Sequence, residues 1–304
     1  MSLLAGIDLG GSQIKAVCLE PDSGRVVGRV TRPTRDGETE QALPGWAVTV
    51  RSLVGELERE WGGVAGLGLC APGLAAADGR SIACMPGRLP GIVGFDWTRH
   101  LGRTELVPVL NDAHAALLGE VSAGAARGRR DVYLLTLGTG VGGAVCADGR
   151  ILRGAIGRAG HLGHLCLDPE GPLDVTRTPG SLEDLVGEHT VRERSGGRFG
   201  TTRELVSAYA AGDVEAGRVW LKSVRALACA IASLNNVLDP ELVVLGGGIA
   251  AAGPRLFEPL ARELAEVEWR PYGRGVPVVQ AELGEWAGAI GAAHQAGQLL
   301  RLAG

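Results

Sequence analysis

The stretch that decides the fold is LLAGIDLGGS, residues 3–12, in which an apolar run leads to Asp8 and then to a pair of glycines. An apolar run that ends in glycine is typical of a buried strand followed by a tight turn. The same order returns in VYLLTLGTG, residues 132–140, and the triplet Ala-Val-Cys at 16–18 returns at 144–146 with the same spacing. This internal repeat predicts a duplicated domain with a ligand between the two copies.

Strands and helices alternate along the 304 residues, which predicts the α/β class. We expect strands at 3–9, 14–19, 64–71, 107–110, 131–137, 242–245 and 276–281, and helices at 46–61, 112–125, 181–194, 202–211, 213–238, 255–267 and 286–300. Glycine is the compositional outlier at 49 residues, and we expect the excess at turns, at packing contacts and at ligand-facing loops.

Composition narrows the function classes. The net charge of −4 gives no basic footprint for nucleic acid, and no apolar run approaches the ~20 residues of a membrane span. Six scattered cysteines without a CxxC pair favour free thiols in a reducing compartment over a disulfide framework. The first residues lack the basic segment of a signal peptide, so we expect a cytoplasmic protein.

The segment Gly138-Thr139-Gly140-Val141-Gly142-Gly143 matches the GxGxxG pattern of dinucleotide-binding folds. That interpretation requires a following helix and an acidic residue ~20 positions on. The residues that follow are strand-like, and Arg158 lies near the acidic position. A glycine turn between two strands instead presents N–H groups to phosphate oxygens, so two facing turns would hold the β- and γ-phosphates of ATP.

These turns resemble a known family. Residues 6–12, GIDLGGS, resemble the first phosphate motif of the sugar kinase/Hsc70/actin superfamily, specifically of the ROK family of sugar kinases. Residues 138–143 are similar to its second phosphate motif, 238–248 to its adenosine motif and 288–293 to its closing helix. The resemblance implies ATP and Mg²⁺ as cofactors. It assigns nucleotide binding to Asp8, Gly10, Gly11, Ser12, Gly138, Thr139, Gly140, Gly246, Gly247 and Gly248.

The resemblance also implies the architecture and the reaction. We expect a duplicated actin-like ATPase (ribonuclease H-like) fold with domains 1–112 and 113–304 on either side of a cleft, the last helix packing back on the first domain. The implied activity is ATP-dependent phosphorylation of a sugar hydroxyl, of the glucokinase or N-acetylhexosamine kinase type. A homodimer or tetramer that binds a small-molecule sugar is the implied assembly.

The segment NDAHAA, residues 111–116, resembles the family's N-D-A-N-A-A. The resemblance makes Asp112 the catalytic base and Asn111 a ligand of the sugar hydroxyls. A cap on the helix that starts here is the alternative for Asp112. Asp8 would orient Mg²⁺ through water, with a turn-capping carboxylate as the alternative.

The sugar-recognition segment departs from the family pattern E-x-G-H, because His161 replaces the glutamate while His164 is kept. By resemblance, His161, His164 and Glu183 would bind the sugar, and the exchange at His161 predicts an altered sugar preference. A favourable charge at a helix start is the alternative for Glu183. Near residues 85–90 the family often has P-N-L with a sugar-binding asparagine; no asparagine aligns here, and Gly87-Arg88 stands nearest. Arg88 would bind an anionic substituent, or else it is a solvated surface residue.

The family's C-x-C-G-x-x-G-C-L-E aligns with DVTRTPGSLE, residues 174–183, which contains no cysteine. No structural zinc is therefore expected. A substitute zinc site built from His161, His164, Cys166 and Asp168 is the alternative.

Two other functions remain open from the residues. The first is a non-catalytic sugar sensor, although the winged helix of DNA-binding family members would have to precede Gly6. The second is an actin-like ATPase without a sugar. The residues do not identify the sugar or the hydroxyl that is phosphorylated, and they do not distinguish ATP from polyphosphate as the phosphoryl donor.

Overall fold

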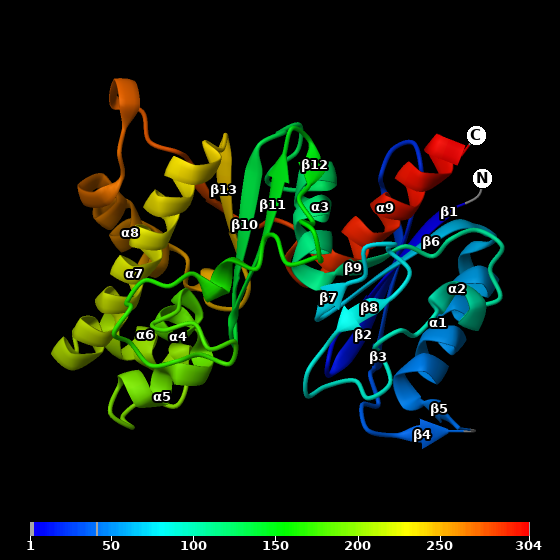
Figure 1. The fold of residues 1–304 in the computed structure, drawn as a ribbon, viewed down its shortest axis with the longest axis horizontal. Coiled ribbons are helices and arrows are strands. Elements are labelled where there is room, and N and C mark those ends of the chain that lie inside the picture. Colours follow the sequence, from blue (N-terminus) through cyan, green and yellow to red (C-terminus); the bar gives the residue numbers. More distant parts are fainter. Residues whose placement is uncertain (1–2, 41, 304) are drawn as a thin grey trace. The chain divides into compact units, whose positions relative to one another are not determined.

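The computed structural model describes residues 3–40 and 42–303, and their contacts form two compact units (Figure 1). The first unit comprises Met1–Gly128, Ile151–Ala159 and Glu282–Gly304, and the second comprises Arg129–Arg150 and Gly160–Ala281. This division differs from the expected 1–112 and 113–304. Helix α3 (Asp112–Ala123) belongs to the first unit because it packs along α9 (Ala287–Ala303).

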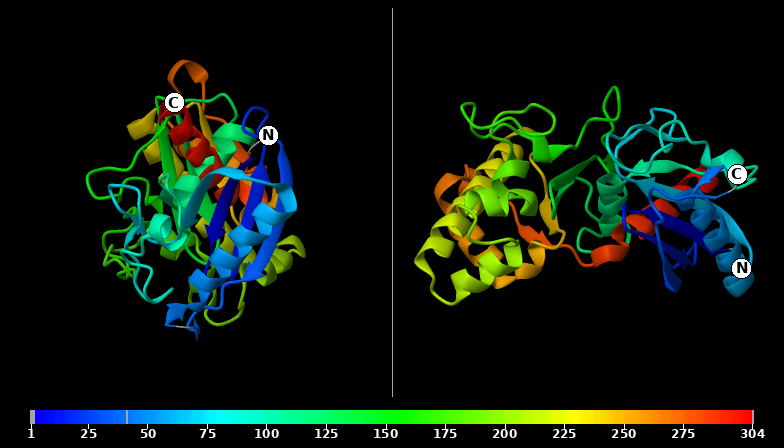
Figure 2. Two further views of the ribbon diagram at one scale, coloured as in Figure 1. Left: turned by 90° about the vertical axis from the view of Figure 1, so that its right-hand side faces the viewer. Right: turned by 90° about the horizontal axis from the view of Figure 1, so that it is seen from below.

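The first unit is built on a five-stranded sheet with the order β3 (Val26–Pro33), β2 (Gln13–Leu19), β1 (Leu3–Leu9), β6 (Val64–Ala71) and β9 (Val109–Asn111). β1 runs antiparallel to β2 and parallel to β6. Alternate residues of β1 serve opposite faces. Leu3, Ala5, Ile7 and Leu9 join the core that includes α1 (Gly45–Trp61), while Leu4 joins the core of α9. Figure 2 shows α9 lying across these strands.

The second unit repeats this sheet. Its order is β12 (Arg150–Ile151), β11 (Val141–Ala147), β10 (Val132–Leu137), β13 (Leu242–Gly246) and β14 (Val278–Gln280). β10 runs antiparallel to β11 and parallel to β13, as β1 does to β2 and β6. Long helices α7 (Val214–Leu238) and α8 (Pro254–Val267) cover its core. The prediction of a duplicated α/β fold is confirmed.

The register shows which part of the sequence repeat is structural. In the first copy Leu9 pairs with Ile14, and in the second Leu137 pairs with Val141, so the second turn is one residue shorter. The repeated Ala-Val-Cys triplets are therefore one residue out of step, because Ala16 pairs with Ile7 whereas Ala144 pairs with Leu134. The duplication lies in the topology and the glycine turns, and the triplet identity is incidental.

Several of the other elements were not predicted, and one expected helix is broken. Edge strand β3 was not predicted. The expected helix at 181–194 is broken at Gly187, where a Cβ would lie 2.7 Å from Glu183 O and 2.9 Å from Thr139 O. The pieces are α4 (Leu182–Val186), η2 (Glu188–Thr190) and α5 (Val191–Arg194); the rest are β4 (Thr39–Glu40), β5 (Leu43–Pro44), β7 (Leu74–Ala75), β8 (Ile82–Cys84), α2 (Trp97–His100), η1 (Leu162–His164), α6 (Thr202–Ala210), η3 (Ala250–Ala252), η4 (Pro271–Gly273) and η5 (Gly284–Trp286). Across the described ranges, no helix combines the length and apolarity of a membrane span.

Direct backbone contact holds α9 in place. A Cβ on Gly6 of β1 would lie 1.9 Å from Ala289 O, and one on Gly68 of β6 would lie 2.0 Å from Ala292 O. On the other side of α9, a Cβ on Gly291 would lie 1.8 Å from Ala115 O of α3. Because carbonyl oxygens of the backbone cannot swing aside, these three positions require glycine.

We expect Gly291→Ala to destabilise the protein by ~2 kcal/mol or more, since the added methyl group forces α9 away from α3. Gly217→Ala is the matched control. Gly217 also lies inside a helix, α7, but its Cβ would meet only Tyr209 at 3.6 Å. That control should be stabilising by about 0.5–1 kcal/mol through reduced backbone entropy of the unfolded chain. Urea unfolding of both variants is the measurement, and equal midpoints would contradict the packing argument.

Candidate functional site

The first glycine turn joins β1 to β2 at the carboxyl end of β1. Gly10 N donates to Gln13 O at 3.0 Å. Buried Thr34 fixes the turn from the side, because its Oγ1 donates to Gly10 O at 2.6 Å and its N donates to Ser12 O at 3.0 Å. Within the described chain the N–H groups of Gly11 and Ser12 donate to no protein acceptor. The turn is thus a fixed loop with two N–H groups to spare, as an anion site requires.

Asp8 lies beside this turn at the end of β1 and is surrounded by three elements. In the sheet it pairs with Lys15 on β2 and with Cys70 on β6. A Cβ on Gly288, in the first turn of α9, would lie 2.8 Å from Asp8 Oδ2. Desolvation and then the charge of Asp112 raise the pKa of Asp8 to about 7, against Lys15 and a hydrogen bond from the Cys70 thiol. Two interacting carboxylates in such surroundings favour a bound cation or a shared proton.

Asp112 is the first residue of α3, and Asn111 is the cap of that helix. Asn111 Oδ1 accepts from Ala113 N at 2.9 Å and from His114 N at 3.1 Å. Its Nδ2 donates to Asp112 Oδ1 at 2.8 Å and to Gly73 O at 3.0 Å. The capping alternative for Asp112 thus belongs to Asn111. Asn111 has no spare donor for the sugar hydroxyl that we expected it to bind.

The second glycine turn, Gly138–Gly140, is held by the segment that begins at Glu183. Glu183 Oε2 accepts from Val141 N at 2.9 Å, and a Cβ on Gly140 would lie 2.2 Å from that oxygen. The N–H groups of residues 188 and 189 donate to Gly138 O and Thr139 O at 2.9 and 3.0 Å. As in the first turn, the N–H groups of Thr139 and Gly140 have no protein acceptor in the described residues. Glu183 therefore positions the second glycine turn, a role that the sequence did not indicate.

The glycine run Gly246–Gly248 lies beside the same turn. Gly246 pairs with Thr136 at the end of β13. Gly247 has φ +84°, and a Cβ there would lie 2.3 Å from Leu137 O. Only glycine fits this position, and the run therefore reaches the end of β10 where the second turn begins.

The sugar-recognition candidates of the second unit also converge on Val141. A Cβ on Gly163 would lie 1.8 Å from Val141 O, so the loop carrying His161 and His164 lies directly on β11. His164 Nδ1 bonds Asp174 Oδ2 at 2.8 Å. The structure thus brings together His164, Glu183 and the second turn within the second unit. The candidates of the first unit, which are the first turn, Asp8, Asn111 and Asp112, gather at the carboxyl end of its sheet.

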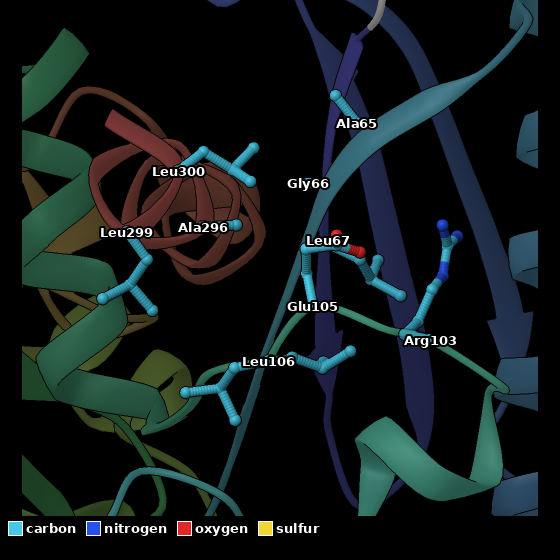
Figure 3. A pocket seen from close by; sticks show the side chains of 10 residues that line it. Ala65, Gly66, Leu67, Arg103, Glu105, Leu106, Ala296, Leu299 and Leu300 are labelled. Atoms are coloured by element: carbon cyan, nitrogen blue, oxygen red, sulfur yellow. The ribbon is translucent and has the colours of Figure 1, made fainter. Parts of the chain in front are cut away.

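An apolar pocket of about 330 Å³ in the first unit is separate from these residues (Figure 3). It is lined mainly by Ala65, Leu67, Leu106, Ala296, Leu299 and Leu300. Gly66 in its wall pairs with Leu4 at the start of β1, whereas Asp8 pairs with Cys70 at the other end of β6. The pocket therefore lies at the opposite end of strands β1 and β6 from Asp8.

The alternative zinc site is not assembled. His164 Nδ1 is engaged by Asp174, and Asp168 Oδ1 accepts from Glu170 N at 3.1 Å. In the described part of the chain, no group of three or more His, Cys, Asp or Glu side chains is placed to hold a metal ion.

Sequence reasoning missed residues that act on their neighbours. Thr34 fixes the first turn, and Cys70 donates to Asp8. His114 is buried and bonds Ala159 O at 2.9 Å, just ahead of the sugar-recognition segment. Asp174 was noticed only as a replaced cysteine. Their partners are distant in sequence, so no local pattern could reveal them.

Comparison with known proteins gives one matching family model and several relatives. The family model described as ROK family matches residues 4–298. The chain is 31% identical to a glucokinase of Halalkalibacterium halodurans over 94% of this chain and 92% of that protein. It is 34% identical to an N-acetylmannosamine kinase of Citrobacter koseri over 83% of this chain and 85% of that protein.

Solved structures agree with these relatives. A ROK hexokinase from Thermus thermophilus has a TM-score of 0.86 and 34% identity, covering 99% of this chain and all of that one. A ROK glucokinase from Streptomyces griseus, solved with glucose and AMPPNP, has a TM-score of 0.77 and 26% identity, covering 98% of this chain and all of that one.

The raised pKa of Asp8 predicts how stability depends on pH in the metal-free protein. The native state keeps a proton that the unfolded state releases between pH 3.8 and about 7. The stability that this proton contributes is fully present below pH 3.8 and is lost as pH rises through about 7. Since Asn cannot ionise, Asp8→Asn should become more stable than the wild type by a few kcal/mol between pH 5 and 8.

Thermal unfolding in EDTA at pH 5.5, 7.0 and 8.5 tests this expectation. Asp22→Asn, on the exposed turn after β2, is the matched control and should follow the wild type at every pH. Parallel curves for Asp8→Asn and the wild type would show that Asp8 ionises normally.

Proposed function

Because the chain belongs to the ROK family and is an ATP-dependent sugar kinase, we propose that Asp112 is the general base that activates the sugar hydroxyl. The observation that carries this proposal is the arrangement of the Asp112 carboxylate. Asn111 Nδ2 and Ala113 N both donate to Oδ1 at 2.8 Å. These donors stabilise the charged carboxylate and fix its rotamer at the exposed start of α3.

In the proposed reaction the sugar hydroxyl oxygen attacks the γ-phosphorus of ATP. The hydroxyl proton passes to Asp112, the bond between the γ-phosphorus and the β–γ bridging oxygen breaks, and ADP leaves. The amides of Gly11, Ser12, Thr139 and Gly140 donate to the phosphate oxygens, as the spare N–H groups of both turns support. Gly246–Gly248 leaves room for the adenosine beside the second turn.

Mg²⁺ is the metal that we propose for the first unit. Asp8 would hold it through water, and the desolvated carboxylate beside the charge of Asp112 fits a cation. When bound, Mg²⁺ supplies charge neutralisation on the phosphates.

We infer that Arg88 supplies a further positive charge at the first turn. A Cβ on Gly11 would lie 3.1 Å from Arg88 Nη1, so the exposed guanidinium lies over the turn. None of the ion pairs among the described residues involves Arg88. This placement supports an anion contact over the solvated alternative.

The residues that we propose for sugar binding lie in the second unit. We propose that His161 and His164 bind sugar hydroxyls and that Glu183 contributes while it holds the second turn. Asn111 acts through Asp112, because its carboxamide is fully engaged. Glucose and N-acetylmannosamine are the first sugars to test, since relatives are named for these activities. His161 in place of a glutamate supports a preference that differs from that of a glucokinase.

The proposed setting is the cytoplasm, where ATP is available and the six cysteines, all free, stay reduced. By resemblance to the family we propose a homodimer or a tetramer.

Replacing the base should separate catalysis from binding. We expect Asp112→Asn to lower kcat by about 10²–10⁴-fold, with KM for ATP and sugar changed only a few-fold. The melting temperature should not fall, because Asn111 is the cap, the new carboxamide oxygen still accepts its two hydrogen bonds, and the substitution removes a negative charge beside Asp8. The measurement is ADP release with and without a panel of hexoses and N-acetylated hexosamines. Sugar binding by the wild type without turnover on any sugar would favour the sensor instead.

The charge on Arg88 has its own test. We expect Arg88→Gln to raise KM for ATP about five- to tenfold, because an exposed charged contact contributes ~1 kcal/mol. Arg80→Gln removes another exposed charge, on the turn between β7 and β8, and should leave KM unchanged. Equal effects of the two variants would return Arg88 to the role of a solvated residue.

A further inference from the structure

His164 and Asp174 form a hydrogen-bonded pair inside the second unit. His164 Nδ1 lies 2.8 Å from Asp174 Oδ2. The Asp174 side chain is fully buried, whereas the His164 side chain keeps 28% of its surface exposed, so a ligand can reach the ring. The pair belongs to the segment that contacts β11 through Gly163 and the second turn through Glu183.

The Asp174 carboxyl is held in its charged form. Its Oδ1 accepts from Thr176 N and Thr176 Oγ1 at 2.8 Å each and from Thr178 N at 2.9 Å. Burial by itself raises the pKa of Asp174, but the hydrogen bonds from His164, Thr178 and Thr176 outweigh it and hold that pKa below its usual range. An ionised carboxylate has no proton to donate.

This charge state decides the tautomer of His164. Because Asp174 only accepts, the proton of the shared hydrogen bond must be on His164 Nδ1. In the neutral imidazole, Nε2 then carries a lone pair and accepts a hydrogen bond.

The residues around His164 do not fit the zinc that the family resemblance implies. The three positions aligned with the family's cysteines are Asp174, Thr176 and Ser181. Two of them offer hydroxyl groups, and Ser181 Oγ is engaged with Asp184 N at 3.2 Å as the cap of α4. A metal on Nδ1 would leave Nε2 as an N–H donor, so a carboxylate at this place reverses the polarity of the ring.

We propose that Asp174 is a positioning residue that holds His164 in the Nδ1–H tautomer, so that His164 accepts a hydrogen bond from a sugar hydroxyl instead of donating one. The inference rests on the proposed function, in which His164 binds the sugar. It also defines a substrate feature, because the group opposite Nε2 must be a donor such as a free hydroxyl. A carbonyl oxygen at that place is disfavoured.

The tautomer is measurable without any activity. Long-range ¹H–¹⁵N correlation spectra of the full chain labelled at its six histidines, recorded at pH 8, should show His164 protonated at Nδ1 and bare at Nε2. His164→Gln assigns the signal by its loss. Stoichiometric zinc in the purified protein, or an Nε2–H signal for His164, would overturn the proposal even if the kinase is active.

Asp174→Asn should reverse the direction of the hydrogen bond to His164 and preserve the hydrogen bonds that hold the loop. Its Oδ1 still accepts from Thr176 and Thr178, and its Nδ2 donates to His164 Nδ1, which moves the proton to Nε2. We expect the NMR signature to switch and KM for the sugar to rise about tenfold or more, with kcat changed only a few-fold. Asp168→Asn, on the same loop without a histidine contact, should change neither the tautomer nor KM.

The outcomes separate the two proposals. Absence of sugar-dependent ADP release by the wild type would contradict the proposed function and leave the tautomer result standing. An active kinase in which Asp174→Asn switches the tautomer without raising KM would overturn the role of His164 as an acceptor. If Asp174→Asn does not fold, the wild-type spectrum alone decides the tautomer.

Discussion

Direct contact between backbones at glycine is the constraint on which the rest of the structure depends. In the first unit, Gly6, Gly68 and Gly291 let α9 approach two strands and α3 with no side chain between. That approach brings the first turn of α9 against Asp8, which is one reason why this carboxylate is desolvated. The packing of the helix and the ionisation of the proposed magnesium residue therefore have a common cause.

The second unit has the same kind of contact at Gly163. Gly163 lies on Val141 O, and Glu183 accepts from Val141 N, so one residue of β11 contacts both the loop that carries His161 and His164 and the segment that holds the second glycine turn. A displacement of either segment would act on the other through Val141. The candidate sugar and nucleotide residues of this unit are thus held in fixed positions by contacts to the same residue, Val141, as a preorganised site requires.

The sequence predicted the features that local patterns encode. The glycine turns after β1 and β10 and the acidic residues at strand ends could be read directly, and the duplicated fold follows from them. The roles of Thr34 and Cys70 could not be read, because each acts on a residue far along the chain. The Ala-Val-Cys identity shows the opposite error, since a matching triplet lies out of register when one turn is shorter. Glu183 was found by resemblance, but its contact with Val141 required the structure.

In the loop at 165–181, a buried carboxylate stands where the family pattern has a cysteine. Zinc would fix a loop by a few strong bonds to cysteine, whereas here one buried carboxylate accepts four hydrogen bonds, from Thr176, Thr178 and His164. The two arrangements differ in the state in which they leave His164. A metal ion would bind the lone pair of Nδ1, whereas a carboxylate accepts a hydrogen bond and therefore requires a proton on Nδ1. Under the proposed role of His164, Asp174 therefore sets the hydrogen bond offered to the substrate, and sugar preference would depend on Asp174 as well as on His161.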